Sequence, residues 1–250
     1  MTHDTQPDGG AQPSEPEAGS PLESDGVAHR AAPAENISVT EPEDALPGVT
    51  LGKLPQSMQD ACGRSGWTEL MPVQSLALPY LLARRDLMVQ SRTGSGKTGA
   101  YLLPLVQQLS SGRSAVQALV LVPTRELAVQ VDREAATLFE GTGLAAAAVY
   151  GGVGYGRQME ALRGGVQLVV GTPGRVLDHL LRRTLTLDAL RMLVFDEADR
   201  MLSIGFYPDM KEVQRYLPKK RIPTCLFSAT YPPHVLHLAG EFLTAPSMLS

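Results

Sequence analysis

Short apolar runs, each followed by a more polar segment, recur along most of this chain and restrict its fold more than any other feature. They lie at Leu87–Gln90, Ala118–Val122, Leu144–Val149, Gln167–Val170, Met192–Phe195 and Thr224–Phe227. Continuous apolar runs of this length are typical of strands that are covered on both faces. Their alternation with helical patterns predicts an α/β fold, a doubly wound and mostly parallel sheet with helices on both faces. Ligands of such a sheet bind at the carboxyl ends of its strands.

The segments between these runs have helical periodicity. Arg125–Phe139 places four apolar residues on one face, namely Leu127, Val131, Ala135 and Leu138. A second apolar face consists of Val176, Leu177, Leu180 and Leu181. We expect a helix to begin near Lys97 and to be kinked by Pro104, because proline cannot donate the helical hydrogen bond.

Charge is distributed unevenly along the chain. The whole sequence has 22 Lys+Arg and 26 Asp+Glu. Residues 1–45 contain ten of the acidic side chains and only one basic one, so the rest is mildly basic. The first segment is also rich in Pro, Gly and Ser and lacks aromatic residues, which predicts a disordered acidic tail over 1–46 and a folded domain over 47–250. The tail is either a solvated segment without a specific role or a competitor of a polyanion for the basic body.

The composition argues against membrane and secretory proteins. No run of about 18 apolar residues is present, as a membrane span requires. The start, MTHDTQPDGG, lacks the basic and apolar segments of a secretory signal. Cys62 and Cys225 are too few for a disulfide framework or a zinc site, and Cys225 lies in a predicted strand as a core residue. We therefore expect a cytoplasmic protein with no membrane partner.

A phosphate-binding pattern follows the first predicted strand. The run SRTGSGKT at 91–98 fits G-x-x-x-x-G-K-[ST], except that Ser91 replaces the first glycine. Gly94 and Gly96 let the backbone N–H groups point inward, Lys97 can lie between two phosphates, and Thr98 offers a hydroxyl to Mg²⁺. A Gly/Ser turn with a chance lysine is the alternative. The strand before and the helix after favour a phosphate loop.

Acidic residues follow the predicted strand Met192–Phe195. Asp196 can hold Mg²⁺ through water, since this ion keeps several of its waters. Glu197 can orient and deprotonate an attacking water. The alternative is a strand-to-helix turn in which acidic residues favour the start of the helix. Together with the phosphate loop, the pair indicates a site for a nucleotide and Mg²⁺.

Six short motifs occur in order along the chain. They are SRTGSGKT (91–98), PTRELA (123–128), Gly151-Gly152, TPGR (172–175), DEAD (196–199) and SAT (228–230). With them the chain resembles the first, amino-terminal RecA-like domain of the DEAD-box ATP-dependent RNA helicases, over roughly Val49–Ser250. The resemblance implies a RecA-like P-loop NTPase domain that binds and hydrolyses Mg-ATP, coupled to the binding and local unwinding of RNA.

The resemblance also implies residue roles. Lys97, Asp196 and Glu197 would be catalytic, and Thr98 and Asp196 would hold the metal. The ATP phosphates would lie against Ser91, Arg92, Thr93, Gly94, Ser95, Gly96, Lys97 and Thr98. One RNA strand would follow Pro123, Thr124, Arg125, Gly152, Thr172, Pro173, Gly174 and Arg175. Coupling of hydrolysis to strand separation would fall to Asp199, Ser228 and Thr230. Such phosphate contacts predict salt-dependent and largely sequence-independent RNA binding. Taken alone, TPGR is equally a helix start with Pro173 near its first position.

The segment Gly66–Gln74 is similar to the adenine-reading element of the family. Gln74 would bond the adenine edge with one donor and one acceptor, which favours ATP over GTP. The sequence departs from the family at Met71, where Thr or Ser is usual, and at Val49, where the family has an aromatic residue. Both departures bear on adenine stacking. Trp67 is expected to be a packing residue rather than a base platform.

The family has a second RecA-like domain, which completes the RNA groove and the ATP site, and no motif of it follows Thr230 here. We therefore expect an amino-terminal fragment, a truncated product, or a protein that works with a second domain in cis or in trans. The first hypothesis is the ATP-binding half of an RNA-stimulated ATPase, weak or inactive alone. The alternative is a nucleotide- or RNA-binding module without turnover that acts with a partner. A DNA-directed helicase is a third hypothesis.

Overall fold

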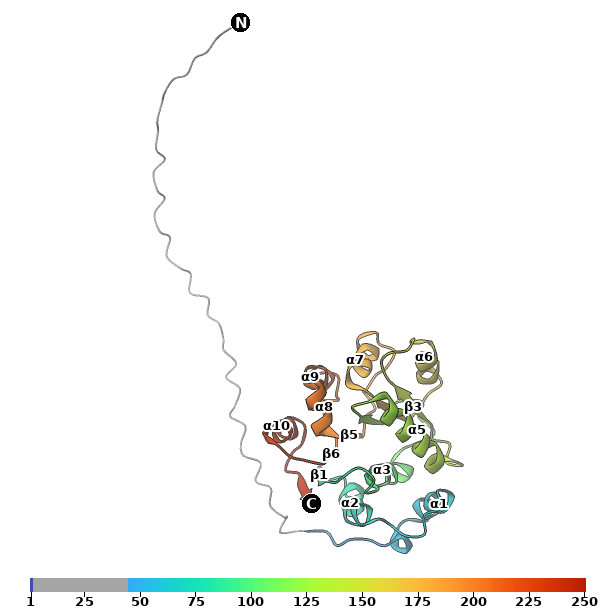
Figure 1. Cartoon of the computed structure of the whole chain (residues 1–250). Helices are drawn as coiled ribbons and strands as arrows, with labels where there is room; N and C mark the ends of the chain where they lie inside the picture. The colour runs from blue at the N-terminus through green and yellow to red at the C-terminus, as the bar shows by residue number, and fades with distance from the viewer. Residues whose placement is uncertain (2–44) are drawn as a thin grey trace. The chain divides into compact units, whose positions relative to one another are not determined.

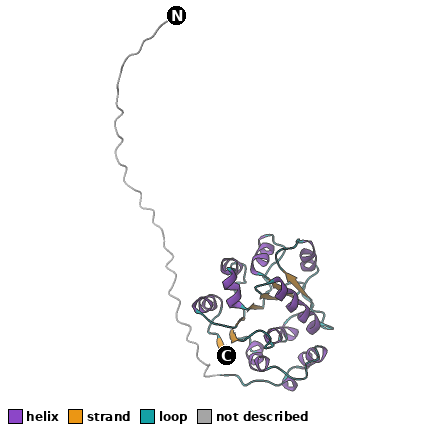
Figure 2. Ribbon diagram, in the orientation of Figure 1, coloured by secondary structure: helices purple, strands orange, loops and turns teal. Residues whose placement is uncertain are grey.

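The structure is a computed structural model that describes Met1 and residues 45–250. The predicted acidic tail lies outside the described residues, apart from Met1, Ala45 and Leu46. Helices surround a central sheet in the rest of the chain (Figures 1 and 2). The α/β architecture predicted from the apolar runs is therefore confirmed.

The sheet of the described residues has seven strands in the order β3-β4-β2-β5-β6-β1-β7, and all of its pairings are parallel. The strands are β1 (Leu87–Gln90), β2 (Ala118–Leu121), β3 (Ala146–Val149), β4 (Leu168–Gly171), β5 (Met192–Asp196), β6 (Thr224–Ser228) and β7 (Ser247–Leu249). The first six coincide with the six predicted runs to within two residues at each end. The short edge strand β7 has no counterpart among the predictions.

The helices form two groups, one on each face of the sheet. The structure has η1 (Leu51–Lys53), α1 (Gln56–Arg64), α2 (Pro72–Leu82), α3 (Lys97–Leu102), α4 (Leu105–Gln108), α5 (Arg125–Phe139), α6 (Gly156–Arg163), α7 (Pro173–Leu181), α8 (Ala198–Ile204), α9 (Tyr207–Gln214) and α10 (Pro233–Phe242). Helices α1 to α5 contribute to one buried cluster, and α6 to α10 pack against the other.

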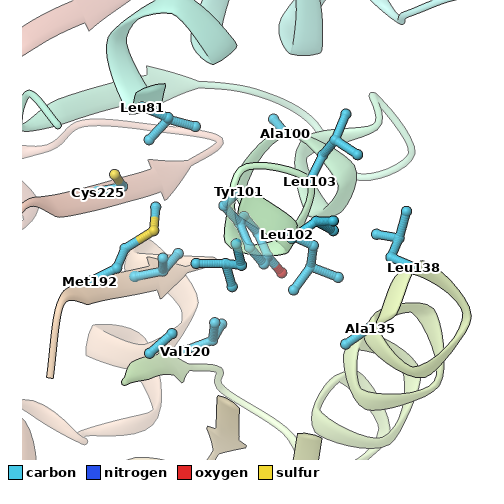
Figure 3. Close-up of a cluster of buried hydrophobic side chains, with 14 of the residues drawn as sticks. Leu81, Ala100, Tyr101, Leu102, Leu103, Val120, Ala135, Leu138, Met192 and Cys225 are labelled. Carbon is cyan, nitrogen blue, oxygen red and sulfur yellow. The ribbon is translucent and has the colours of Figure 1, made fainter. Parts of the chain in front are cut away.

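Strand residues alternate between the two clusters, as the pleat of a strand requires. In β1, Leu87 and Val89 belong to the first cluster, whereas Met88 belongs to the second. Figure 3 shows the first cluster, with Tyr101 of α3 among residues from several elements. Cys225 is fully buried in the same cluster, which confirms its assignment to the core. The sheet is thus covered on both faces, and ligands can reach it at its strand ends.

The helical predictions are confirmed with one correction. Helix α5 has the predicted bounds, and Val131, Ala135 and Leu138 are fully buried. The helix that begins at Lys97 ends at Leu102 and resumes as α4 after Pro104, in agreement with the expected kink. Leu181 does not share the buried face of α7, because its relative exposure is 62%. It is the last residue of the helix and lies about 100° around the axis from the buried Leu180.

Among the described residues, no helix combines the length and the apolar character that crossing a membrane requires.

Candidate nucleotide and RNA site

All the motifs lie at the carboxyl ends of the strands. These ends form one edge of the sheet, because every strand is parallel, and each motif directly follows a strand. The nucleotide motifs follow β1, β5 and β6, which are neighbours in the sheet. The motifs with predicted RNA contacts follow β2, β3 and β4, which are also neighbours. The order of the strands therefore places the nucleotide motifs in one half of this edge and the motifs with predicted RNA contacts in the adjacent half.

The phosphate loop, residues 91–96, is anchored to β6 at its first residue and closed by a hydrogen bond within the loop. The Ser91 N–H donates to the carbonyl of Ser228 at 3.0 Å, and the Ser91 and Ser95 hydroxyls are hydrogen-bonded to each other. Gly94 and Gly96 have φ of 82° and 87°. Such angles favour glycine, since a Cβ crowds the backbone there. They give the loop the tight curl that was predicted from its sequence.

Lys97 brings the phosphate loop and the acidic pair together. Its Nζ lies 3.1 Å from Asp196 Oδ1 and 3.5 Å from Glu197 Oε1, and the lysine is nearly buried. Glu197 has φ of 57°, a left-handed conformation that is costly for a residue with a side chain. Backbone outliers of this kind are concentrated at functional sites. The lysine and both carboxylates of the prediction thus form one group.

Asp196 is fully buried, at 0% exposure. Burial raises the pKa of this carboxyl group, and the charge of Lys97 and a hydrogen bond from Tyr101 act in the opposite direction. Its Oδ2 accepts a hydrogen bond from the Tyr101 hydroxyl at 2.8 Å. Its Oδ1 lies near Lys97 but accepts no hydrogen bond of good geometry. One oxygen of a buried carboxylate therefore has coordination capacity left.

These residues fit a magnesium ion that is bound together with a nucleotide. Among the described residues, no group of three or more His, Cys, Asp or Glu could hold a metal by itself. Mg²⁺ is usually bound by one or two carboxylates together with substrate phosphates and water. Asp196 with its spare oxygen and Thr98 at the start of α3 supply a donor set of that kind.

A cleft of about 490 Å³ opens between the phosphate loop and the segments that follow β5 and β6. Its lining includes Thr93, Lys97, Glu197, Asp199, Arg200 and Thr230. Arg200 Nη1 lies 3.3 Å from Glu197 Oε2. Charged side chains of both signs contribute to this lining, which suits a phosphate chain with its metal ion.

Asp199 connects the DEAD segment to the SAT segment. Its Oδ2 accepts hydrogen bonds from the Thr230 hydroxyl at 2.9 Å and from the Thr230 N–H at 3.2 Å, and its own N–H donates to Ser228 Oγ at 3.2 Å. Burial opposes the ionisation of Asp199, but hydrogen bonds from Thr230 and Ser228 outweigh it and lower the pKa of the carboxyl group. The structure thus joins the three residues to which coupling was assigned.

Gln74 is buried between the segment before α2 and the phosphate loop. Its Nε2 donates to the carbonyl of Gly96 at 3.1 Å, and its Oε1 accepts from the Met71 N–H at 2.9 Å. One amide hydrogen and one lone pair remain for a ligand. A largely apolar cavity of about 390 Å³ lies beside it, lined by Met71, Val73 and Leu249 among others. Trp67 packs against the core cluster, in agreement with a packing role.

The residues with predicted RNA contacts differ in exposure. Arg125 and Gly152 are exposed, and Thr124 and Gly174 are half-buried. The remaining four are buried, namely Pro123, Thr172, Pro173 and Arg175. Thr124 caps α5, because its hydroxyl accepts the Leu127 N–H at 3.2 Å. The buried members of the set can shape this edge but offer little side-chain surface to a strand of RNA.

The guanidinium of Arg175 points into the protein and supports the loop that contains Gly152. Its Nη2 donates to the carbonyl of Val153 at 2.9 Å. Its Cζ lies 4.2 Å from the centre of the Tyr155 ring, and the Cζ of Arg182 lies 4.3 Å from the same centre. Tyr155 also donates to Asp178 Oδ2 at 2.9 Å. The geometry assigns to Arg175 the support of this loop.

Two residues near the site were not predicted from the sequence, Tyr101 and Tyr155. Tyr101 lies in an apolar run and has the pattern of a core residue, which it also is. The one signal was its spacing, since it follows Lys97 by four residues and so lies on the same helix face. Tyr155 occurs in a glycine-rich loop that gives no periodicity. Its contacts with α7 depend on the sheet order.

Comparison with known proteins gives a consistent result. The DEAD/DEAH box helicase family matches residues 71–238. The chain is 41% identical over 196 residues to the "ATP-dependent RNA helicase CshA" of Listeria monocytogenes, covering 78% of this chain and 38% of that protein. It is similar in structure to a DEAD box protein from the hyperthermophile Methanococcus jannaschii, with a TM-score of 0.74 and 36% identity, covering 78% of this chain and 53% of the other. The chain therefore spans about half the length of these relatives or less.

The family match covers more than half of the chain and includes the phosphate loop, the acidic pair and the SAT segment. The parallel sheet, with the phosphate loop after β1 and the acidic pair after β5, agrees with the RecA-like fold of the similar solved structure. The chain belongs to the DEAD/DEAH box helicase family and contains its amino-terminal RecA-like domain.

Proposed function

We propose that this chain is the ATP-binding half of an ATP-dependent RNA helicase, which hydrolyses Mg-ATP and couples this to the binding and local unwinding of RNA. The observation that carries the proposal is the contact of Lys97 with both Asp196 and Glu197, at 3.1 and 3.5 Å. It unites the phosphate loop with the acidic pair in a polar cleft. A family relative named as an ATP-dependent RNA helicase supports the same activity.

Each residue of the nucleotide half has a proposed task. The backbone of residues 91–96 and Lys97 bind the phosphates, and Thr98 and Asp196 hold the metal. Mg²⁺ supplies charge neutralisation on the phosphates when it is bound. Glu197 orients a water and takes its proton. Gln74 reads the adenine edge with its remaining donor and acceptor.

The RNA half of the edge has the proposed task of holding a sugar-phosphate backbone. Arg125 and the backbone at Gly152 and Gly174 are the accessible members of the set. We assign direct phosphate contacts to them, and to Pro123, Thr172, Pro173 and Arg175 the shaping of this edge. Thr124 contributes through the helix start that it caps. Contacts to phosphate alone make the binding independent of base sequence.

A second RecA-like domain, in cis or in trans, belongs to the proposal. An arginine that stabilises the transferring phosphate is worth about 10³–10⁵ in rate in related chemistry. Asp199 and Thr230 line the cleft that such a domain would cover, and the buried Ser228 is hydrogen-bonded to Asp199. We assign the coupling to these three residues. We also propose a cytoplasmic location, since Cys62 and Cys225 are both free thiols.

Nucleotide binding and turnover separate the proposed roles. Lys97→Ala is expected to abolish ATP binding, because it removes the cation that faces the phosphates. Glu197→Gln is expected to keep ATP bound and to lower RNA-stimulated turnover by about 10²–10⁴-fold, the usual contribution of a general base. Calorimetry measures binding to this chain. A phosphate-release assay with RNA and the second domain measures turnover.

Glu212→Gln is the matched control, since Glu212 is an exposed carboxylate on α9 that pairs with Arg215. It is expected to leave both quantities unchanged. Full turnover of Glu197→Gln would remove that residue from its role. Tight ATP binding without any turnover of the wild type, even with the second domain and RNA, would favour the alternative of a binding module. A competition between RNA and DNA decides the substrate.

A further inference from the structure

Tyr101 places a hydroxyl group directly behind the acidic pair. The residue lies on α3, one turn after Lys97, and its exposure is 0%. The hydroxyl donates to Asp196 Oδ2 at 2.8 Å. Both partners are fully buried, so water does not compete for this hydrogen bond.

The ring of Tyr101 is held by a further contact. The ring lies edge-on to Phe227 of β6, with the two centroids 5.3 Å apart and the planes at 63°. The ring contact thereby holds the hydroxyl of Tyr101 in place behind Asp196. Figure 3 shows Tyr101 inside the core cluster that holds it.

The two oxygens of Asp196 differ in their surroundings. Oδ2 receives the Tyr101 hydroxyl, whereas Oδ1 lies 3.1 Å from Lys97 Nζ and accepts no hydrogen bond of good geometry. A carboxylate that is bonded at one oxygen cannot rotate freely. The bond from Tyr101 thus selects the orientation in which Oδ1 faces Lys97 and the phosphate loop.

We propose that Tyr101 is a positioning residue of the magnesium site, which holds the Asp196 carboxylate with one oxygen toward the metal. The proposal deepens the proposed function and rests on it. Hydrogen bonds from outside the ligand set commonly fix the orientation of a metal-binding side chain, and their loss costs about 10–100-fold in metal affinity or activity. A Phe at this position would fill the core equally well but would leave Asp196 Oδ2 without a partner.

The test is the Mg²⁺ dependence of nucleotide binding, measured without turnover. Tyr101→Phe removes one oxygen and keeps the ring against Phe227. The affinity for a non-hydrolysable ATP analogue is measured by calorimetry in EDTA and over a series of Mg²⁺ concentrations. We expect the affinity in EDTA to be unchanged. The Mg²⁺ concentration at which half of the Mg²⁺-dependent increase in affinity is reached should rise by about 10-fold or more.

Tyr80→Phe is the matched control. Tyr80 belongs to the same core cluster, is 2% exposed, and its hydroxyl accepts a hydrogen bond from the Leu46 N–H, away from the nucleotide edge. The Tyr80→Phe substitution also removes one buried hydroxyl, yet the Mg²⁺ dependence of the nucleotide affinity should stay as in the wild type. Thermal melting of both variants shows that each is folded.

The outcomes distinguish the proposals. A Tyr101→Phe variant with the Mg²⁺ dependence of the wild type overturns the role of Tyr101 and leaves the proposed function standing. An equal loss of affinity with and without Mg²⁺ assigns Tyr101 a structural role only and overturns the inference as well. A wild type whose nucleotide affinity does not respond to Mg²⁺ overturns the proposed function and, with it, the inference.

Discussion

Position 99 has room for a hydrogen atom but not for a methyl group. A Cβ added to Gly99 of α3 would lie 2.4 Å from Trp67 Cη2 and 2.6 Å from Gln74 Nε2. The indole is rigid, and the Gln74 amide is held by Met71 and Gly96. The aromatic residue before α2 and the glycine after the phosphate loop are therefore matched in size.

Gly99→Ala should consequently destabilise the protein. Overpacking of this kind typically costs about 1–3 kcal/mol, which exceeds the gain of about 1 kcal/mol that alanine brings to a helix. Urea denaturation measures the difference. We expect Trp67→Phe in the same chain to restore part of the loss, because the smaller ring does not reach as far.

Gly63→Ala serves as the control for Gly99→Ala. Gly63 also lies in a helix, α1, and an added Cβ there meets nothing within 4 Å. Gly63→Ala should therefore leave the free energy of unfolding unchanged or raise it by at most about 1 kcal/mol. A Gly99→Ala variant that is as stable as Gly63→Ala would contradict the size matching of Gly99 and Trp67.

At the scale of single elements, α5 depends on its cap. This helix of 15 residues packs its buried face on the sheet, and its first turn lies at the edge that carries the motifs. The backbone of Thr124 is extended, and its hydroxyl accepts the Leu127 N–H. Thr124 is thus a structural residue as well as one of the residues that are predicted to contact RNA.

Thr124→Ala should lower the free energy of unfolding by about 1 kcal/mol, the usual loss when a threonine cap is removed. Thr124→Ser keeps a hydroxyl and should retain most of the stability. Thr137→Ala is the internal control, because Thr137 is an exposed residue within the same helix and alanine favours helices there. Equal denaturation midpoints for Thr124→Ala and the wild type would argue against the cap.

At the scale of the whole molecule, the sheet order separates two ligands. Motifs after β5, β6 and β1 face the nucleotide cleft, and those after β3, β4 and β2 form the other half of the same edge. The Asp199 contacts with Ser228 and Thr230 lie within the nucleotide half. Substitutions in one half should therefore leave binding of the other ligand largely intact.

Arg125→Ala should weaken RNA binding and leave ATP binding unchanged. Lys97→Ala should weaken ATP binding and leave RNA binding unchanged. The loss of one phosphate contact reduces the slope of log affinity against log salt by about 0.7 for a single strand. Fluorescence anisotropy with single-stranded RNA at several salt concentrations measures the slope. Arg133→Ala is the control, since Arg133 is exposed on the same helix about two turns farther from the edge.

A loss of RNA affinity that is equal for Arg125→Ala and Arg133→Ala would indicate a general charge effect rather than a track along this edge. Weaker ATP binding by Arg125→Ala would contradict the separation of the two halves.

Local sequence patterns were sufficient to predict six of the seven strands and the positions of the motifs after them. Six strands were predictable because runs that are buried on both faces are apolar throughout, whereas β7 has only three residues at the sheet edge. The phosphate loop and the acidic pair were also predictable, since both are local and each follows a strand directly.

The contacts of the individual site residues, in contrast, became known from the three-dimensional structure. The bond of Tyr101 to Asp196, the fit of Gly99 to Trp67 and the inward orientation of Arg175 join residues that are 22 to 95 positions apart. Such contacts depend on the order of the strands and on how α3 and α7 cross them. Local propensity and periodicity carry no information about that order, because any arrangement of parallel strands satisfies the same pattern.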